Sequence, residues 1–492
     1  MPYCITFLIA FCFCNPVKAQ NRKPTYNPPP IALRKLNEGQ LKADFGTLEH
    51  ALVETYGGIY RLSDSIHVQK RFDKYRRQLA IINDQADFIS LLTTLIASFR
   101  EGHMKVEYDD ETNNLLKTSK LFPFTIMVEN EKLRVLYNET AEDQSITPGM
   151  EILSINGHQS GSLIKAMIPH ISADGYGYSH RNKRLADNFS QNLWLYFGQQ
   201  DRFNIKAKNS TGKVIITNVV GVTDAHRQIN RLSIVNLQVR KGVTQFEGRG
   251  PNVSLSFTNE GKTANLRIQG FKGKEFENEL DSVFRIVDQK NTKTLILDLR
   301  SNGGGEDVYG AALVSHLTSA PFRYFRKIQM RTIKPSFGGW SHDLLNILDT
   351  GTVTDPVDRH LLTGAIKAGI NIQQPSSINF KGKLFVLTDG YTFSTAADAA
   401  AVIRQITTAI FIGEETGGGA EGNTSGIFLQ AKLPNSGLKV IIPSLCYWNA
   451  VTVRKKNRGV LPDHPLINSV TDILESNDRQ WKYAAALALE SD

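Results

Sequence analysis

A single serine, Ser394, stands where an apolar segment gives way to an alanine-rich one. FVLT (385–388) has the composition of a buried strand and STAADAAAVIRQ (394–405) that of a helix, with the turn DGYTF between them. A serine at the start of a helix ordinarily serves as its N-cap. The same place also suits a nucleophile, because the positive end of a helix stabilises a developing anion by about 0.3–1 kcal/mol.

Two glycine-rich turns also follow predicted strands. LDLRSNGGGED (297–307) leaves an apolar strand through three consecutive glycines, and IFIGEETGGGAEGNTSG (410–426) is a second glycine-dense loop. Glycines let backbone N–H groups approach a ligand closely, although many such turns only bend the chain. Because the chain alternates strands and helices here, we expect an α/β core whose working edge lies at the strand C-termini.

Several other chemistries are disfavoured by the sequence. Thr392 occupies the first glycine position of G-x-S-x-G, which argues against the nucleophile turn of an α/β-hydrolase. The 11 histidines are dispersed, without H-E-x-x-H or paired cysteine ligands, so no metal and no cofactor are expected. The net charge is +9, but the densest basic cluster, VRKKNR (453–458), has no interleaved aromatic residues, and nucleic acid is not expected as a partner.

The first residues have the composition of a targeting segment. An apolar run over 5–13 is too short to cross a bilayer, and Val17 and Ala19 have the spacing of a cleavage site, which predicts a signal peptide over 1–19. The protein is therefore expected to be exported, periplasmic or secreted, and no later segment is apolar for long enough to span a membrane. Of the four cysteines only Cys446 would remain after cleavage, so no internal disulfide is expected.

The rest of the chain divides by pattern. A Pro-rich leader over 20–35 precedes helical periodicity, which predicts an N-terminal helical domain over 36–115. Short strands and turns occupy 120–215, and strands alternating with helices predict the α/β core over 225–475, followed by a C-terminal tail over 476–492.

Six motifs, in this order along the chain, carry a family resemblance: EGHMKVEY, ITPGMEILSINGH, LILDLRSNGGGE, LTDGYTFSTAADA, GEETGGG and NRGVLPDHPL. Together they resemble the C-terminal processing (tail-specific) peptidase family, which includes the tricorn protease core, over about 44–475. The resemblance implies a mixed α/β fold with a ClpP/crotonase-like peptidase core, the N-terminal helical domain, and a PDZ-like module over 120–215. It also implies a serine endopeptidase that acts on peptide or protein substrates.

Within that resemblance, Ser394 is the nucleophile. The oxyanion hole is expected from the backbone N–H of Thr395 and from that of Gly304 or a neighbouring glycine of the 303–305 turn. The Ser-Lys branch of the family places a lysine 25 positions after the serine, but Gly419 stands there and 410–431 contains no Lys or Arg. The tricorn-like branch instead uses a histidine from upstream, and His103 occupies that place.

A neutral imidazole, with a pKa of about 6.5, suits proton removal near pH 7. The tricorn pattern has a serine before this histidine, where the present chain has Gly102, and the C-terminal glutamate of that branch is missing. The candidate residues that could orient the imidazole instead are Glu101, Glu414 and Asp463.

These departures leave a second hypothesis open, that of a catalytically weak or inactive peptidase-fold protein that binds peptides or apolar ligands. A third hypothesis is an esterase or amidase acting on non-peptide substrates. Asp298 and Arg300, in the LDLR segment, are expected to anchor the end of the sheet rather than to take part in chemistry.

Overall fold

The fold is that of a computed structural model, which describes residues 33–82, 84–140, 143–231, 247–248, 252–337, 351–355, 359–364 and 368–489. The predicted signal peptide and most of the Pro-rich leader lie outside these residues. Among the described helices, none combines the length and the hydropathy that crossing a membrane requires.

The first helices begin where the sequence supplies capping side chains. Asn37 and Gln40 form a capping box at α1 (Glu38–Thr55), and Asp64 and Asp84 accept backbone N–H groups at α2 (Ser65–Gln78) and α3 (Gln85–Ser98). The helix α4 (Asp110–Thr118) follows the short strand β1 (Lys105–Glu107). The helical character predicted for 36–115 is therefore present, with one strand inside it.

The middle of the chain forms an antiparallel sheet with its own apolar core, which includes Phe122, Phe124, Ile152 and Phe203. Its strand order is β2-β3-β4-β6-β7, with β5 paired to β4. The strands are β2 (Phe124–Glu129), β3 (Lys132–Asn138), β4 (Glu151–Ile155), β5 (His158–Gln159), β6 (Arg202–Lys208) and β7 (Val214–Val220). The helices α5 (Ser160–Met167), α6 (Ser179–Asp187) and α7 (Phe189–Phe197) accompany this sheet. Its likeness to a PDZ module stays a prediction.

The α/β core is built on a seven-stranded sheet with the order β21-β18-β17-β11-β10-β9-β8. Its strands are β8 (Glu247–Gly248), β9 (Val253–Thr258), β10 (Thr263–Ile268), β11 (Thr294–Asp298), β17 (Lys383–Thr388), β18 (Ile410–Gly413) and β21 (His464–Pro465). The strands from β10 to β21 run parallel, and β9 and β8 are antiparallel. Both faces of this sheet are covered, as expected of a parallel sheet.

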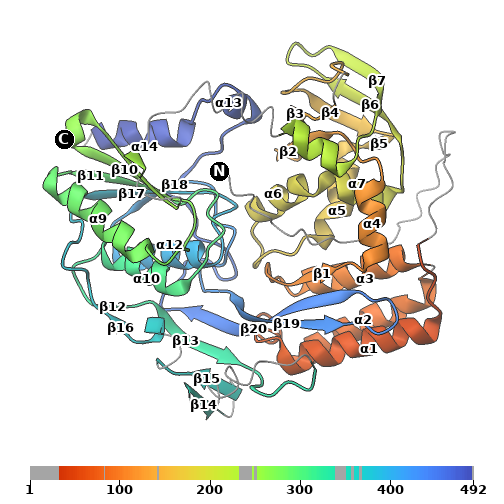
Figure 1. The fold of residues 1–492 in the computed structure, drawn as a ribbon, viewed down its shortest axis with the longest axis horizontal. Helices are drawn as coiled ribbons and strands as arrows, with labels where there is room; N and C mark the ends of the chain where they lie inside the picture. Colours follow the sequence, from red (N-terminus) through yellow and green to blue (C-terminus); the bar gives the residue numbers. More distant parts are fainter. Residues whose placement is uncertain are drawn as a thin grey trace.

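Side chains along the central strands alternate between two apolar clusters. Leu295 and Val386 face the helices α9 (Phe276–Gln289), α10 (Asp307–Ser315) and α12 (Thr395–Ile406), which lie below the sheet in Figure 1. Ile296 and Phe385 face α14 (Arg479–Leu489) on the other side.

The predicted C-terminal tail is therefore wrong over 479–489, because α14 belongs to the core. Ala484 and Ala488 pack on the sheet, and small residues one turn apart let the helix approach closely. The start of α14 is tied to the sheet through Arg300, whose guanidinium donates to Asp298 and Asp478 at 2.7–2.8 Å. These contacts agree with the anchoring role expected of Asp298 and Arg300.

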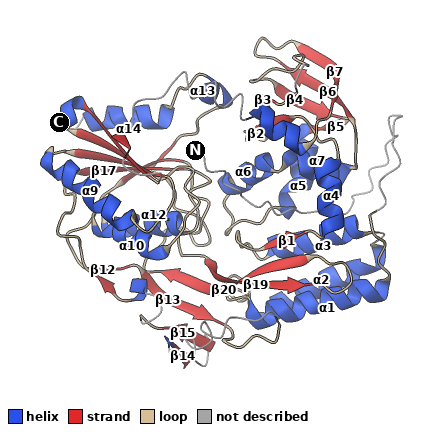
Figure 2. Ribbon diagram, viewed as in Figure 1, coloured by secondary structure: helices blue, strands red, loops and turns tan. Residues whose placement is uncertain are grey.

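A second large sheet joins the two ends of the chain. It has the order β1-β20-β13-β15-β14, with β19 paired to β20. Besides β1, the strands of this sheet are β13 (Phe325–Met330), β14 (Thr352–Asp355), β15 (Arg359–Leu362), β19 (Thr424–Lys432) and β20 (Lys439–Asn449). Outside it, β12 (Phe322–Arg323) pairs with β16 (Ile372–Gln373), and the short helix α13 (Val470–Leu474) precedes α14. Figure 2 shows β19 and β20 running from the core to the N-terminal helices.

The pairing of β1 with β20 has a direct consequence for the site. Val106 lies opposite Val440, so a segment from the first quarter of the chain is hydrogen-bonded to one from the last. Ala431 and Val440 belong to the same apolar cluster as the α1–α3 side chains. The N-terminal helices and the α/β core are thus joined through a shared sheet, and residues 101–103 are carried with β1 to the core.

We expect Ala484→Leu to lower the free energy of unfolding by about 1–3 kcal/mol, because Ala484 is 0% exposed against the sheet and a larger side chain overpacks it. The matched control is Ala486→Leu on the exposed side of the same helix, for which a change within about 0.5 kcal/mol is expected in denaturant titration. Equal effects of the two substitutions would show that α14 does not pack on the sheet.

Candidate active site

Ser394 lies between β17 and α12 in a strained backbone conformation. Its φ is 53° and its ψ is −132°, a region that residues other than glycine rarely adopt. The side chain is partly exposed and makes no capping hydrogen bond to the helix. The position is that of an N-cap, but the hydroxyl is not used as one, which leaves it available for chemistry.

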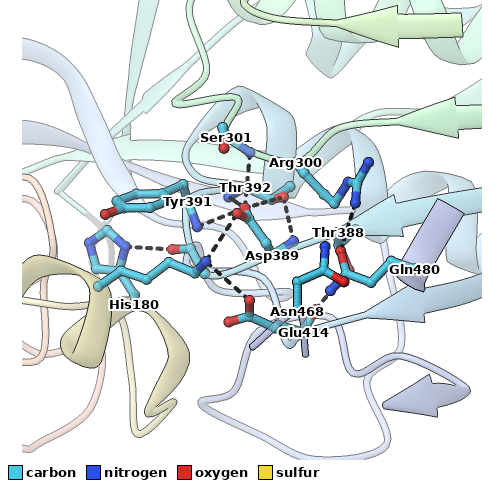
Figure 3. Close-up of polar contacts among 12 residues, drawn as sticks. His180, Arg300, Ser301, Thr388, Asp389, Tyr391, Thr392, Glu414, Asn468 and Gln480 are labelled. Carbon is cyan, nitrogen blue, oxygen red and sulfur yellow. Dashed lines mark hydrogen bonds and ion pairs between the residues drawn. The ribbon is translucent and has the colours of Figure 1, made fainter. Parts of the chain in front are cut away.

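The turn before Ser394 is held by a buried carboxylate. Asp389 Oδ1 accepts the backbone N–H groups of Ser301, Tyr391 and Thr392 at 2.9–3.1 Å, and Thr392 Oγ1 donates to the carbonyl of Leu299 (Figure 3). Burial alone would raise the pKa of Asp389, but the neighbouring Lys183 ammonium and the backbone donors lower it overall. This network joins the ends of β11 and β17 and supports the strain at Ser394.

The glycine turn after β11 packs directly against the nucleophile turn. Gly304 has φ +99°, and a Cβ there would lie 2.7 Å from Ser394 Cβ and 2.9 Å from Thr395 N, so only glycine fits. Thr395 Oγ1 donates to the carbonyl of Gly305 at 2.6 Å, which ties the start of α12 to this turn.

The amide of Gly304, expected as an oxyanion donor, is already engaged. It donates to Asn302 Oδ1 at 2.9 Å, because the asparagine side chain folds back over its own turn. The sequence also allowed a neighbouring glycine of the 303–305 turn as the oxyanion donor, so the amides of Gly303 and Gly305 remain as candidates for this role. The N–H of Thr395, at the first position of α12, has no intrahelical acceptor and points from the positive end of the helix.

His103 is held beside this turn. Its ring lies 4.5 Å, centroid to centroid, from that of Phe393, the residue before Ser394. Nδ1 is 2.9 Å from Glu101 Oε1, and since an ionised carboxylate can only accept, Nδ1 carries the proton and Nε2 is left as a proton acceptor. The side chain of His103 is 12% exposed.

Of the three carboxylates that were candidates to orient the imidazole, Glu101 is the one that contacts it in the described part of the chain. Its Oε2 also accepts the backbone N–H of Thr424 at 3.1 Å, at the start of β19. Glu414 pairs instead with Lys183 at 3.0 Å, and Asp463 with Arg404 at 2.8 Å. Glu101 is the carboxylate that contacts the imidazole because the loop before β1 places Glu101 and His103 side by side.

Electrostatics favour a protonated intermediate on His103. Burial lowers the pKa of the imidazole, but the hydrogen bond and charge of Glu101, with the charges of Asp174 and Asp398, raise it above its ordinary value overall. An imidazolium formed during a reaction is therefore stabilised by three surrounding carboxyl groups.

Asp174 is a site residue that no sequence motif pointed to. It lies in the segment between η2 (Ile168–His170) and α6. Its Oδ1 accepts the N–H of Gly102 at 2.8 Å and its Oδ2 that of Gly419 at 3.1 Å. Burial, reinforced by the nearby Glu101, raises the pKa of Asp174 to about 7. Asp174 thus joins the histidine loop to the second glycine-rich loop.

Glu101, His103 and Asp174 also offer one ligand atom each within 4.8 Å of one another, an arrangement that could hold a metal ion. His103 Nδ1 is, however, engaged by Glu101, and the two carboxylates already accept the backbone N–H groups of Gly102, Gly419 and Thr424. These hydrogen bonds fit an acid–base network better than a metal centre.

Residues 262–466 match the family model of Peptidase family S41, the family of C-terminal processing peptidases. The chain carries a domain of peptidase family S41. The family resemblance seen in the motifs is confirmed, and a domain of this family implies a serine-type peptidase, which is a hydrolase.

Solved structures agree on this fold. It is similar to mature CPAF, with a TM-score of 0.61, 16% identity, and coverage of 92% of this chain and 96% of that one. It is also similar to mature CPAF complexed with lactacystin, with a TM-score of 0.62, 16% identity, and coverage of 92% and 98%. At this identity the likeness shows the fold alone, and it confirms the mixed α/β class.

The photosystem II D1 C-terminal processing protease also matches, at a TM-score of 0.41 and 14% identity over 89% of this chain and 96% of that one, too low a score to carry an argument. No curated protein matches the sequence.

Because the conformation of Ser394 is one that glycine adopts freely, we expect Ser394→Gly to raise the free energy of unfolding by about 1–2 kcal/mol, by releasing strain. Ser394→Ala keeps the Cβ and the strain, so a change within about 0.5 kcal/mol is expected. Urea titration of the two variants checks this, and equal stabilities would contradict the strain.

Proposed function

We propose that this protein is an exported serine endopeptidase with Ser394 as nucleophile and His103 as general base. The observation that carries the proposal is the strained turn of Ser394, packed on one side against Gly304 and on the other, through Phe393, against a His103–Glu101 pair. Strain and a carboxylate-oriented imidazole beside one hydroxyl are features of catalytic sites rather than of structural serines.

The chemistry follows from the order of the groups. His103 Nε2 takes the proton of Ser394 Oγ as Oγ attacks the scissile carbonyl, and it returns this proton to the leaving amine. Glu101 keeps the proton on Nδ1 and stabilises the imidazolium. The N–H of Thr395, with that of Gly303 or Gly305, stabilises the oxyanion, and one donor of this kind lowers the barrier by about 3–4 kcal/mol. Water then repeats the cycle on the acyl-enzyme.

An extended peptide is the substrate that the surroundings suit. A cavity of about 1310 Å³ lies between the middle domain and the α/β core, lined by β2, by α6 and by the nucleophile turn at Tyr391. β2 is an edge strand of its sheet, so its free edge can accept a peptide as an added strand. This supports a role for the PDZ-like module in docking the substrate before cleavage.

The export part of the proposal rests on the predicted signal peptide over 1–19. N-terminal sequencing of the protein recovered from its producing cells tests it: a mature chain that begins near Gln20 supports export, and an intact Met1 contradicts it.

Ser394→Ala is expected to abolish hydrolysis of unfolded protein substrates and labelling by a fluorophosphonate probe, because the neighbouring hydroxyls of Thr392 and Thr395 already donate to backbone carbonyls. The melting temperature is expected to change by no more than a few degrees. Labelling of the parent protein that is lost in Ser394→Ala supports Ser394 as the nucleophile. An unlabelled parent that still binds peptides would favour the non-catalytic binding protein, and retained turnover in the variant would assign another nucleophile.

Glu101→Gln is expected to move the acidic limb of the kcat/KM profile to lower pH. The base is active when neutral, Glu101 raises its pKa, and removing the charge lets the imidazole lose its proton at lower pH. We also expect kcat to fall by about 100-fold or more, because control of the tautomer is lost.

The control is Asp463→Asn, which removes a candidate orienting acid that pairs with Arg404. It is expected to leave the acidic limb in place. A shift of that limb in Asp463→Asn, without one in Glu101→Gln, would contradict the assignment of Glu101.

A further inference from the structure

Phe393, the residue before Ser394, lies between two histidine rings. His103 is 4.5 Å from its centroid at an interplanar angle of 35°, and His180 is 4.7 Å away at 6°, close to parallel. The phenyl ring therefore separates the proposed base from a second imidazole.

His180 is fixed as a neutral, non-titrating group. It is 7% exposed, and its Nδ1 donates to the carbonyl of Gly390 at 2.8 Å. Burial, with the nearby Arg184 charge, lowers its pKa to about 3. A histidine that stays neutral across the working range of pH and donates to a backbone carbonyl acts through its position, not as a second base.

Three glycines make room for this stack. A Cβ at Gly102 would lie 2.6 Å from Phe393 Cζ, one at Gly417 would lie 2.7 Å from His180 Nδ1, and one at Gly390 would lie 2.6 Å from the carbonyl carbon of Ser179. A side chain at Gly102 or Gly417 would collide with one of the rings, and one at Gly390 would collide with the backbone at the start of α6. The glycine before His103, where the tricorn-like pattern has serine, is thus explained by the phenyl ring that occupies its side-chain space.

The helix that carries His180 is anchored at further points along the same turn. One α-helical turn after His180, Lys183 bridges Asp389 and Glu414 at 3.2 and 3.0 Å. At the end of α6, Asp187 accepts the Tyr391 hydroxyl at 2.6 Å. Figure 3 shows His180 and Glu414 on either side of the turn that contains Asp389 and Tyr391. His180 therefore presents its ring from a rigid element.

We propose that His180 is a positioning residue of the peptidase site: its ring and its hydrogen bond to Gly390 hold Phe393, and Phe393 sets the placement of the His103 imidazole relative to Ser394. The inference rests on the proposed function. Because α6 lies within the predicted PDZ-like segment, the geometry of the reacting groups depends on a helix outside the α/β core.

The chain offers a matched control for this arrangement. His316, the C-cap of α10, stacks on Phe284 at 4.4 Å and 3°, and its Nδ1 donates to the carbonyl of Ile378 at 2.7 Å. It also contacts Asp281. His316 lies at the end of α10 opposite the glycine turn, so the same substitution removes the same kind of contacts away from the reacting groups.

The experiment compares His180→Gln, which loses the ring, with His180→Phe, which keeps a ring and loses the hydrogen bond, and with His316→Gln. The readouts are kcat and KM for a peptide substrate, the rate of Ser394 labelling by a fluorophosphonate, and the melting temperature. We expect His180→Gln to lower kcat and the labelling rate by about 10–100-fold with KM within about twofold, because small displacements of reacting groups are costly. His180→Phe is expected to keep more activity, and His316→Gln to keep that of the parent.

Full activity in His180→Gln, or an equal loss in His316→Gln at an equal change in melting temperature, would overturn the positioning role. Should His180→Gln not fold, Phe393→Leu removes the ring between the histidines: a loss of kcat with unchanged KM supports the role, and unchanged kcat overturns it. An inactive, unlabelled parent would instead overturn the proposed function itself, so the two failures are distinguishable.

Discussion

The conformation of Ser394 is the constraint on which the site depends. A residue with a Cβ at φ 53° and ψ −132° persists only when its surroundings leave no alternative. Here they are Asp389, which gathers three backbone N–H groups before the serine, Gly304, which closes against its Cβ, and the first turn of α12 after it. The strain presents the hydroxyl to solvent while the helix end and the glycine turn supply amides beside it.

The second requirement is that an imidazole from another part of the chain reach this hydroxyl. The pairing of β1 with β20 meets it, because it draws residues 101–103 onto a sheet that continues into the α/β core. Thr424 N donates to Glu101 from the start of β19, which pairs with β20 in the same sheet, so the acid that orients His103 is itself fixed by the late part of the chain. The base therefore depends on the same sheet that joins the N-terminal helices to the core.

Three buried acids lie around this histidine, and only one of them is paired with it. Glu101 has the imidazole as partner, whereas burial raises the pKa of Asp174 and of Asp398 to about 7. The two carboxylate oxygens of Asp174 accept the backbone N–H groups of Gly102 and Gly419, and Asp398 accepts the side-chain amides of Asn423 and Asn449. Both acids therefore hold loops in place. The arrangement stabilises positive charge at one place, His103, which is where the proposed reaction generates it.

The sequence by itself determined the strand-to-helix turn at Ser394, the two glycine-rich turns and the alternation of strands and helices. These are local patterns, set by side-chain periodicity and by the backbone freedom of glycine. It could not separate Glu101 from Glu414 and Asp463, show that Asn302 takes the amide of Gly304, or find Asp174, His180 and the packing of α14. Those depend on which distant segments meet, and only the tertiary structure decided them, because a hydrogen bond or a stacked ring acts over a few ångströms whatever the separation along the chain.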